Sequence, residues 1–345
     1  MRFYVGIGLF FTHKKIKVYG KENIPSNGPL LFIGNHQNAL IDAILIPTTN
    51  RRNIHFLTRA SAFKKGLINK LLRSINMIPV YRIRDGRNSM EKNIEVFKQC
   101  FEILNEGKAI QVFAEGEHHI KRSIIPLKKG FARIILGTLQ KYPHLKIKIV
   151  SVGLNYDTRL GFPASVTIYY GEAFEANSYF DLNNPDLRFK DSIDKVSSEL
   201  KKVTTHIEND ENYDKTYSAL KNLGIDFLNP IEANTKIKEI EDGKLIPSNI
   251  KEVKNHINWF LPIHIITKLN SLFPLLIWQY LKTKISDIIF TNTYRFALIV
   301  TVFPIFYLIQ TLVINYFFNG RIALFYLLTT ILFGIITKRT LKANR

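Results

Sequence analysis

Cysteine is nearly absent from this 345-residue sequence, in which Cys100 is the single example. One cysteine excludes an intramolecular disulfide framework and any site built from several cysteine ligands. The sequence also contains no recognised zinc-binding spacing, internal repeat, low-complexity tract or nucleic-acid module. Residues 3–11 are apolar, but the small-residue cleavage site of a secretion signal does not follow them. We therefore interpret residues 1–14 as a membrane-docking segment.

Acidic residues are scarce relative to basic ones, because 28 Asp and Glu stand against 48 Lys and Arg, a net charge of +20. Such a charge predicts an anionic partner. Nucleic acid fits this balance, and so do anionic lipid headgroups, which attract each nearby Lys or Arg by about 1 kcal/mol. Charge alone leaves both partners open.

The first 207 residues alternate short β-branched and aromatic runs with amphipathic helical stretches. This pattern predicts an α/β domain over residues 15–207, with a mixed sheet flanked by helices. Several strands are apolar throughout, as expected when helices cover both faces of a sheet. The predicted strands are residues 15–18, 30–34, 54–57, 78–81, 110–114, 147–153 and 166–170, and the predicted helices are residues 61–74, 88–105 and 128–139.

Two further segments follow this domain. Residues 208–257 are polar, charged and compatible with helices, and we interpret them as an accessory helical region without a chemical motif. Residues 258–284 are apolar but contain His264, Lys268 and prolines, which would be costly in a plain membrane span. An interfacial amphipathic segment or a re-entrant helix is the better interpretation.

Residues 285–345 predict a transmembrane helical hairpin with a basic tail. Residues 296–318 are 23 positions without a charge, about 35 Å of helix and enough to cross a hydrocarbon core of about 30 Å. Residues 322–337 add 16 more, with the turn at Asn319 and Gly320. Lys and Arg flank both ends, so the positive-inside rule predicts a multi-pass membrane protein whose catalytic domain faces the cytoplasm. Two helices buried in a large soluble core are the alternative.

One histidine stands out from the nine by its neighbours. His36 lies directly after the apolar run 30–33 and six residues before Asp42. A strand-to-helix turn in an α/β sheet is a place where functional side chains project. Neutral imidazole can take a proton from a hydroxyl near neutral pH, and a carboxylate on its other nitrogen would fix the tautomer. On a regular helix the two side chains would point about 120° apart, so their contact requires an irregular turn. A structural histidine is the alternative interpretation.

The segment Gly34-Asn35-His36-Gln37-Asn38-Ala39-Leu40-Ile41-Asp42 resembles the first signature block of the glycerolipid acyltransferase superfamily. That superfamily includes glycerol-3-phosphate and 1-acylglycerol-3-phosphate acyltransferases. Its members commonly separate His and Asp by four residues, whereas five intervene here, a spacing similar to a fungal-type branch of glycerol-3-phosphate acyltransferases. The resemblance implies that His36 and Asp42 are catalytic.

Three further blocks follow in family order. Residues 78–82 resemble the second block and end in Arg82, which the family uses for the acceptor phosphate, with Arg84 and Arg87 close by. Residues 113–119 resemble the third block, in which Glu115 and Gly116 match while His118 stands where the family has arginine. Residues 149–153 resemble the fourth block weakly, because Ser151 replaces a proline.

By this resemblance, the substrate-binding residues are Asn35, Arg82, Arg84, Glu115, Gly116, His118, His119, Lys121 and Arg122. The last four would supply the positive charge that the missing arginine leaves open. A competing interpretation makes Glu115, Glu117, His118 and His119 metal ligands, but the spacing matches no recognised zinc motif.

The resemblance implies an O-acyltransferase of phospholipid biosynthesis. It would move a fatty acyl chain from acyl-CoA or acyl-carrier protein to the hydroxyl of glycerol-3-phosphate or 1-acylglycerol-3-phosphate. Backbone amides after Gly34 would stabilise the oxyanion. No cofactor beyond the thioester, no metal and no nucleic acid is expected, and membrane lipids are expected partners. The alternatives are another lysolipid or amino-acid lipid acceptor, or a non-enzymatic basic protein that binds anionic lipid or nucleic acid at a membrane.

Overall fold

The α/β part of the chain is built on one eight-stranded sheet in the computed structural model, which describes residues 2–63, 66–81, 89–180, 185–208, 210–244 and 258–341. The strands are β1 (His13–Tyr19), β2 (Leu30–Gly34), β3 (Ile54–Arg59), β4 (Met77–Val80), β5 (Ala109–Val112), β6 (Lys148–Tyr156), β7 (Ala164–Tyr170) and β8 (Phe174–Glu175). Their order is β1-β7-β6-β2-β5-β3-β4, with β8 beside β6. β6 is antiparallel to β7 and β8, and the other pairs are parallel. The predicted mixed sheet is confirmed.

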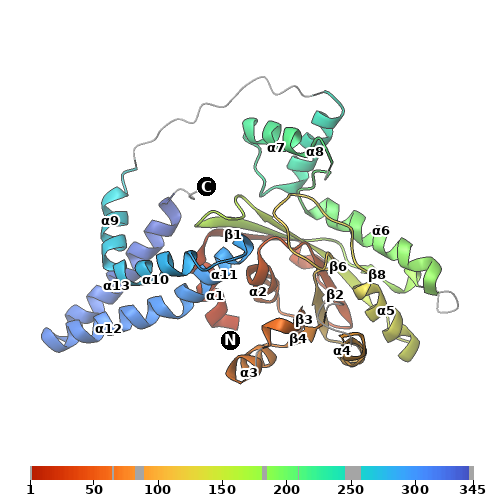
Figure 1. The fold of residues 1–345 in the computed structure, drawn as a ribbon, viewed down its shortest axis with the longest axis horizontal. Coiled ribbons are helices and arrows are strands. Elements are labelled where there is room, and N and C mark those ends of the chain that lie inside the picture. The colour runs from red at the N-terminus through yellow and green to blue at the C-terminus, as the bar shows by residue number, and fades with distance from the viewer. Residues whose placement is uncertain are drawn as a thin grey trace.

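Helices cover both faces of this sheet (Figure 1). The helices of this part are α1 (Arg2–Thr12), α2 (Ala39–Thr49), α3 (Leu67–Ser74), α4 (Ser89–Asn105), α5 (Gly130–Lys141) and α6 (Pro185–Val203). β2 shows the consequence, since Leu31 and Ile33 pack in the core with α4, α5 and α6, while Leu30 and Phe32 pack in the core with α1 and α2. All five residues of β2 are buried. The residue that follows this strand is therefore held by a rigid, fully packed element.

All seven strands predicted from the sequence are present, with ends that differ by at most three residues. The helix predicted over residues 61–74 is wrong in its first half. Residues 60–62 form a short 3₁₀ turn, and α3 begins only at Leu67. Gly66, at a φ of +86°, adopts a backbone conformation that a continuous right-handed helix does not contain.

Two helices, α7 (Tyr213–Asn222) and α8 (Pro230–Glu241), form a small unit at the top of Figure 1. The unit has a core of its own made by Ile207, Tyr213, Leu220, Phe227 and Ile237. Asn229 caps α8 by accepting a hydrogen bond from the backbone amide of Glu232 at 3.4 Å. The unit also contacts α6, where Asn234 donates to the carbonyl of Lys201 at 2.9 Å, and the loop that follows β5, where the amide of Arg122 donates to the hydroxyl of Tyr213.

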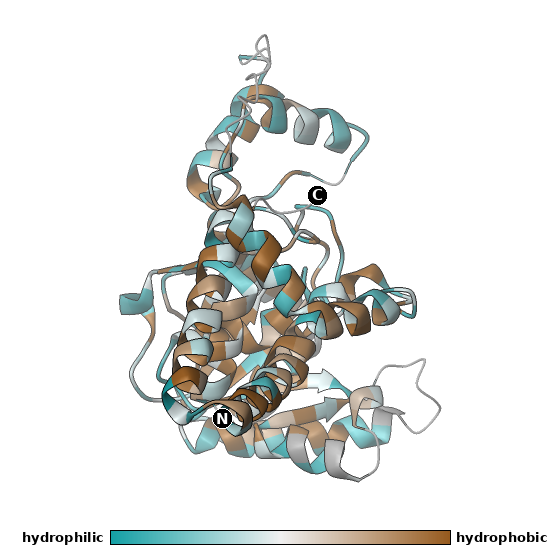
Figure 2. Ribbon diagram, turned by 90° about the vertical axis from the view of Figure 1, so that its left-hand side faces the viewer, coloured by the Kyte–Doolittle hydropathy of each residue, from teal (hydrophilic) through white to brown (hydrophobic). Residues whose placement is uncertain are grey.

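The C-terminal helices are α9 (Leu261–Asn270), α10 (Leu272–Lys282), η5 (Ile288–Phe290), α11 (Thr291–Val300), α12 (Val302–Phe317) and α13 (Gly320–Thr340). Two helical segments, Ile288–Phe317 and Gly320–Thr340, are long and apolar enough to cross a membrane, or three if the bent pair α9–α10 counts as one span. Figure 2 faces this side of the molecule, where hydrophobic colouring is frequent on the helices. Only 6% and 11% of the most apolar 18-residue stretches of these two segments are buried. The alternative of two helices inside a soluble core is therefore wrong.

The sequence places the hairpin turn correctly, because Asn319 caps α13 through hydrogen bonds from the backbone amides of Arg321 and Ile322. α1 joins this hairpin to the sheet. A Cβ on Gly8 would lie 2.8 Å from the ring of Phe296, so only glycine allows α1 and α11 to approach so closely. The opposite side of α1 exposes Phe3 and Ile7.

Candidate functional site

His36 lies in the turn between the carboxyl end of β2 and the start of α2. Asn38 has φ −140° and ψ 45°, and Ala39 has φ +41°, an unusual value for a residue with a side chain. This irregular turn changes the direction in which α2 leaves the strand. It brings Nδ1 of His36 within 3.0 Å of Oδ2 of Asp42, a contact that a regular helix would not allow over six residues.

Asp42 is fully buried and accepts hydrogen bonds on both carboxylate oxygens. Oδ2 accepts from the backbone amides of Gln37 at 2.7 Å and Asn38 at 2.6 Å as well as from His36. Oδ1 accepts from the hydroxyl of Tyr156 at 2.6 Å. A buried carboxylate is tolerated when charge-assisted hydrogen bonds satisfy it. Burial, together with the charge of Asp42, raises the pKa of Tyr156 well above its usual value, so this hydroxyl stays a donor.

The imidazole of His36 is fixed on two further sides. Its ring stacks on Phe113 at 4.1 Å between centroids, and the ring of His118 meets it edge-on at 5.6 Å. The side chain keeps 17% of its surface exposed. Within the described part of the chain, Nε2 has no hydrogen-bond partner. An imidazole held on Nδ1 by a carboxylate, with Nε2 open, can accept a proton from a hydroxyl.

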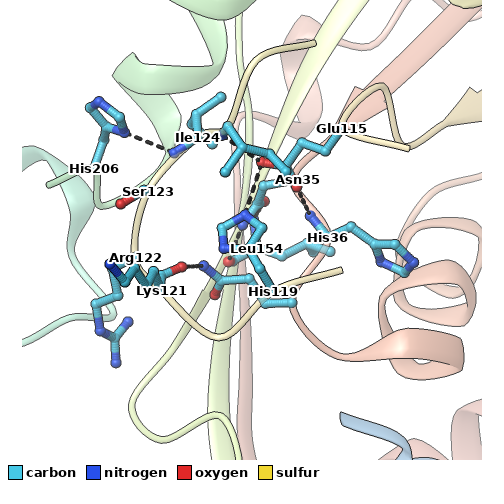
Figure 3. Close-up of polar contacts among 12 residues, drawn as sticks. Asn35, His36, Glu115, His119, Lys121, Arg122, Ser123, Ile124, Leu154 and His206 are labelled. Atoms are coloured by element: carbon cyan, nitrogen blue, oxygen red, sulfur yellow. Dashed lines mark hydrogen bonds and ion pairs between the residues drawn. The ribbon is translucent and has the colours of Figure 1, made fainter. Parts of the chain in front are cut away.

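Glu115 is fully buried and holds the backbone of the histidine turn. Its Oε2 accepts from the amide of His36 at 2.9 Å. Its Oε1 lies 3.4 Å from Nε2 of His119 and 3.4 Å from the amide of Ile125. The amide of His119 in turn donates to the carbonyl of His36 at 3.3 Å. Glu115 and His119 therefore hold the backbone amide and carbonyl of His36 in place (Figure 3).

Two other predicted site residues also serve the backbone. Asn35 is fully buried, and its amide group exchanges two hydrogen bonds with the backbone of Leu154, at 2.7 and 3.1 Å. Gly116 has φ +72°, and a Cβ there would lie 3.0 Å from the side chain of Lys128. The match of both residues to the family blocks thus has a conformational basis.

His118 contacts a distant segment of the chain. Its Nε2 lies 3.2 Å from Oδ2 of Asp287, and its ring meets Phe290 edge-on at 5.3 Å. Asp287 and Phe290 lie at the start of the first long apolar helical segment, so this segment begins directly beside the histidine site. Sequence reasoning missed Phe113 as a neighbour of His36, Tyr156 as a donor to Asp42 and Asp287 as a partner of His118.

The remaining predicted residues do not gather around His36. Lys121 extends over the ring of Tyr213, 4.7 Å from its centroid. Arg122 is 2% exposed, and its guanidinium lies 3.9 Å over the ring of Phe227 and donates to the carbonyl of Asp157. Burial lowers the pKa of Arg122 to about 10, with a smaller effect of Arg159. In Figure 3 the side chain of Arg122 points away from His36.

Arg82 and Arg84, with their neighbour Arg87, lie outside the described residues. Among the described residues, no group of three or more His, Cys, Asp or Glu side chains is arranged to hold a metal ion. The proposed metal interpretation of Glu115, Glu117, His118 and His119 thus gains no geometric support.

The chain matches known proteins over the region that holds this site. Residues 15–155 match the family model described as Acyltransferase. The resemblance to the glycerolipid acyltransferase superfamily, which the sequence blocks carry, is confirmed over this region.

Among curated proteins, the chain is 31% identical over 114 residues to "Glycerol-3-phosphate O-acyltransferase 1" of Saccharomyces cerevisiae, covering 32% of this chain and 15% of the relative. It is 28% identical over 138 residues to "1-acyl-sn-glycerol-3-phosphate acyltransferase" of Borreliella burgdorferi, covering 40% of this chain and 53% of the relative. Among solved structures, it is similar to the 1-acyl-sn-glycerophosphate acyltransferase of Thermotoga maritima, with a TM-score of 0.39, 21% identity and coverage of 54% of this chain and 72% of that one. The match thus spans about a seventh of the yeast relative and about half of the Borreliella one.

Proposed function

We propose that this protein is a membrane-bound O-acyltransferase that moves a fatty acyl chain from a thioester to the hydroxyl of a glycerophosphate. The pair formed by His36 and Asp42, 3.0 Å apart, carries the proposal. The carboxylate orients the imidazole, and the unpartnered Nε2 is the proton acceptor. The match of residues 15–155 to the Acyltransferase family supports this assignment.

In the proposed reaction, Nε2 of His36 removes the proton of the acceptor hydroxyl as its oxygen attacks the thioester carbonyl. A C–O bond forms, the carbonyl π electrons move to oxygen, and Asp42 stabilises the imidazolium. The oxyanion then collapses, the C–S bond breaks, and the departing sulfur takes the proton from His36. The products are an ester and a free thiol, with no acyl-enzyme and no further cofactor.

The sequence suggested that backbone amides after Gly34 stabilise the oxyanion. The amides of residues 36–38 do not serve this role in our proposal, because each already donates to a carboxylate. The amide of His36 donates to Glu115, and those of Gln37 and Asn38 donate to Asp42. We assign the charged part of the acceptor to His118, because its ring is in contact with that of His36. Lys121 and Arg122, which face α7 and α8, have no place in this assignment.

Glycerol-3-phosphate is the acceptor we favour, and 1-acylglycerol-3-phosphate is the second. The spacing between His36 and Asp42 is similar to that of a fungal-type branch, and a yeast relative carries the glycerol-3-phosphate name. The Borreliella relative carries the other name. Acyl-CoA and acyl-carrier protein are both open as donors.

Location follows from the C-terminal helices. We place residues 15–207 as the catalytic domain at the membrane surface, with α12 and α13 crossing the bilayer as a hairpin. Lys282 and Lys284 precede the first span, and Lys338 and Arg339 end the second. By the positive-inside rule these ends, and the catalytic domain beside them, face the cytoplasm.

The experiment that tests the function offers each donor with each acceptor to membranes that contain the protein. Free thiol and extracted ester are measured together, with membranes lacking the protein as the control. We expect thiol release that depends on glycerol-3-phosphate and matches ester formation. Salt-sensitive binding of anionic lipid without any acceptor-dependent thiol release would overturn the proposal in favour of a non-enzymatic protein.

A further inference from the structure

The bent pair α9–α10 makes several polar contacts on its inner side and, apart from the exposed Lys268 and Gln279, carries mainly apolar side chains on its outer side. The chain bends by 80° between the two helices. The large apolar side chains exposed along them and just before α9 are Trp259, Phe260, Leu261, Ile265, Ile266, Leu269, Leu272, Phe273, Leu276 and Tyr280. A surface of this kind does not face water in a stable protein without a partner.

Polar side chains gather at the apex of the bend. The carbonyl oxygen of the Asn270 amide lies 3.1 Å from the hydroxyl of Tyr326 and 3.4 Å from Nε2 of Gln310. The same hydroxyl of Tyr326 lies 2.7 Å from the amide oxygen of Gln310. On the other side of the bend, Ser271 and Tyr307 bring their hydroxyls within 2.6 Å. In hydrocarbon, polar groups must find partners of this kind, because no water satisfies them.

α9 runs antiparallel to α13 and begins beside the C-terminal end of α13. His264 contacts Thr340 at 2.7 Å, and Thr267 contacts Thr337 at 3.1 Å. Asn270 then contacts Thr330 at 3.4 Å. Ten residues of α13 separate the first and last of these contacts, about 15 Å of helix and half the thickness of a hydrocarbon core.

α10 runs back along the other span. Phe273 stacks on Phe306 near the apex, with 5.8 Å between ring centroids. Trp278 lies 4.9 Å from the guanidinium of Arg295, which donates to the carbonyl of Leu160 in the α/β domain at 3.0 Å. At the base of α13, Lys338 donates to the carbonyl of Phe10 in α1. Both arms of the bent pair therefore end at the level of the α/β domain.

We infer that α9–α10 is a re-entrant hairpin that enters the bilayer hydrocarbon from the side of the catalytic domain and leaves on the same side. Its outer face contacts lipid acyl chains, and its apex at Asn270 and Ser271 pairs with the two spans near mid-depth. A single broken span would instead place its ends at opposite ends of the α12–α13 hairpin. The inference rests on the helix contacts and on the proposed crossing of the bilayer by α12 and α13, and it is independent of the reaction.

The test uses single introduced cysteines in the full chain, in sealed membrane vesicles of known orientation. The native Cys100 is fully buried and serves as the unlabelled background. Cysteine replaces Ile231 of α8, Trp259, Leu272, Lys284 or Phe318, and a membrane-impermeant maleimide is added from one side. We expect positions 231, 259 and 284 to react from the same side, and position 318 from the other.

Position 272 should react only after detergent is added. Reaction of positions 259 and 284 from opposite sides would show a broken span and overturn the inference. Reaction of position 272 in intact vesicles as fast as position 284 would show an interfacial segment, which also overturns it.

The unit of α7 and α8, residues 205–208 and 210–244, makes hydrogen bonds that converge on the loop after β5. The amide of Arg122 donates to the hydroxyl of Tyr213 at 2.8 Å, and its carbonyl accepts from the amide of Ile207 at 2.7 Å. Ser123 donates to the carbonyl of Ile207 at 2.6 Å. The amide of Ile124 donates to Nδ1 of His206 at 2.9 Å (Figure 3).

The same loop reaches the histidine turn. The side-chain amide of Gln37 donates to the carbonyl of Lys121 at 3.0 Å. The amide of Ile125 lies 3.4 Å from Glu115, whose other oxygen accepts from the amide of His36. One hydrogen bond joins the loop to Gln37, and two in series join it to His36 through Glu115. Displacement of the loop would therefore shift the backbone that carries the imidazole.

We propose that the unit of residues 205–208 and 210–244 is a clamp that positions the loop 121–125 and, through Glu115 and Gln37, the catalytic histidine. Arg122 is a positioning residue rather than a phosphate ligand. This proposal rests on the proposed acyl transfer. Rates depend steeply on such positioning, since small displacements of a catalytic group lower kcat without weakening substrate binding.

The test compares kcat and the KM for the acceptor in Arg122→Met and Tyr213→Phe, with Tyr19→Phe on the exposed surface as the matched control. Folded enzyme is quantified for each variant, so that loss of stability alone does not lower kcat. We expect both variants to lose kcat at an unchanged KM, while the control equals the wild type. A raised KM in Arg122→Met with a normal Tyr213→Phe would overturn the clamp. An inactive wild type would instead contradict the acyl transfer.

Discussion

Tyr156 donates a hydrogen bond to Oδ1 of Asp42 at 2.6 Å, the carboxylate oxygen that His36 does not use. The hydroxyl reaches Asp42 from β6, 114 residues further along the chain. It completes the set of donors around a carboxylate that has no exposure to water. The orientation of the imidazole therefore depends on the pairing of β6 with β2 as well as on the local turn.

Removal of this hydroxyl gives the first prediction. Tyr156→Phe leaves Oδ1 of a buried carboxylate without its donor, which costs about 1.5–3 kcal/mol for a hydrogen bond to a charged group. We expect a lower free energy of unfolding of that size and a reduced kcat, with the KM for the acceptor unchanged. Chemical denaturation and steady-state kinetics measure the two effects. Tyr169→Phe, at the one partly exposed position of the neighbouring strand β7, is the control; equal behaviour of both variants would contradict the prediction.

The position of His118 beside His36 gives the second prediction. If His118 binds the charged part of the acceptor, His118→Ala should raise the KM for glycerol-3-phosphate about tenfold, the equivalent of about 1.4 kcal/mol of binding. His118→Arg restores the family's residue type and should keep the KM near that of the wild type. His144→Ala, at an exposed position, is the matched control. An unchanged KM in His118→Ala would remove this residue from acceptor binding.

The contact between His206 and Ile124 gives a prediction on pH. Burial lowers the pKa of His206 below 6.5, against the raising effect of its hydrogen bond with Glu208, and its Nδ1 accepts a hydrogen bond that requires the unprotonated nitrogen. Because the folded pKa lies below the unfolded one, the contribution of His206 to stability is complete above pH 6.5 and is lost as the pH falls toward the folded value.

We therefore expect the loop 121–125 to exchange its amide hydrogens faster at pH 5.5 than at pH 7.5, beyond the intrinsic change in exchange chemistry. Hydrogen–deuterium exchange with mass spectrometry measures this. His206→Gln, which does not titrate, should lose the extra pH dependence. The same extra dependence in that variant would contradict the role given to His206.

The local sequence pattern was enough to predict the sheet and the contact between His36 and Asp42. The apolar run of residues 30–34 and the polar turn after it placed His36 at a strand end, and the contact with Asp42 needed only one irregular turn. The turn at Asn319 was predictable because Asn and Gly favour the turn that precedes a helix. Short-range chemistry decides each of these features.

Long-range contacts were not predictable in the same way. Tyr156 and Asp287 reach the site from 114 and 169 residues away from their partners, and no local pattern marks such a contact. Arg122 was assigned to the substrate because basic residues near a family block suggest phosphate binding. Its cation instead lies against Phe227, a residue of the separate small core, so its direction depends on how α7 and α8 pack. Arg82 and Arg84 remain predictions.

The most direct measurement of the central claim is the rate of thiol release by His36→Ala and by wild type in the same membranes with saturating thioester and acceptor. General-base catalysis by one side chain contributes about 10² to 10⁴ in rate. We predict a loss of this size with unchanged membrane attachment and folding, and no loss for His144→Ala. Full activity of His36→Ala would show that this imidazole does not remove the acceptor proton, and the account of the site would be wrong.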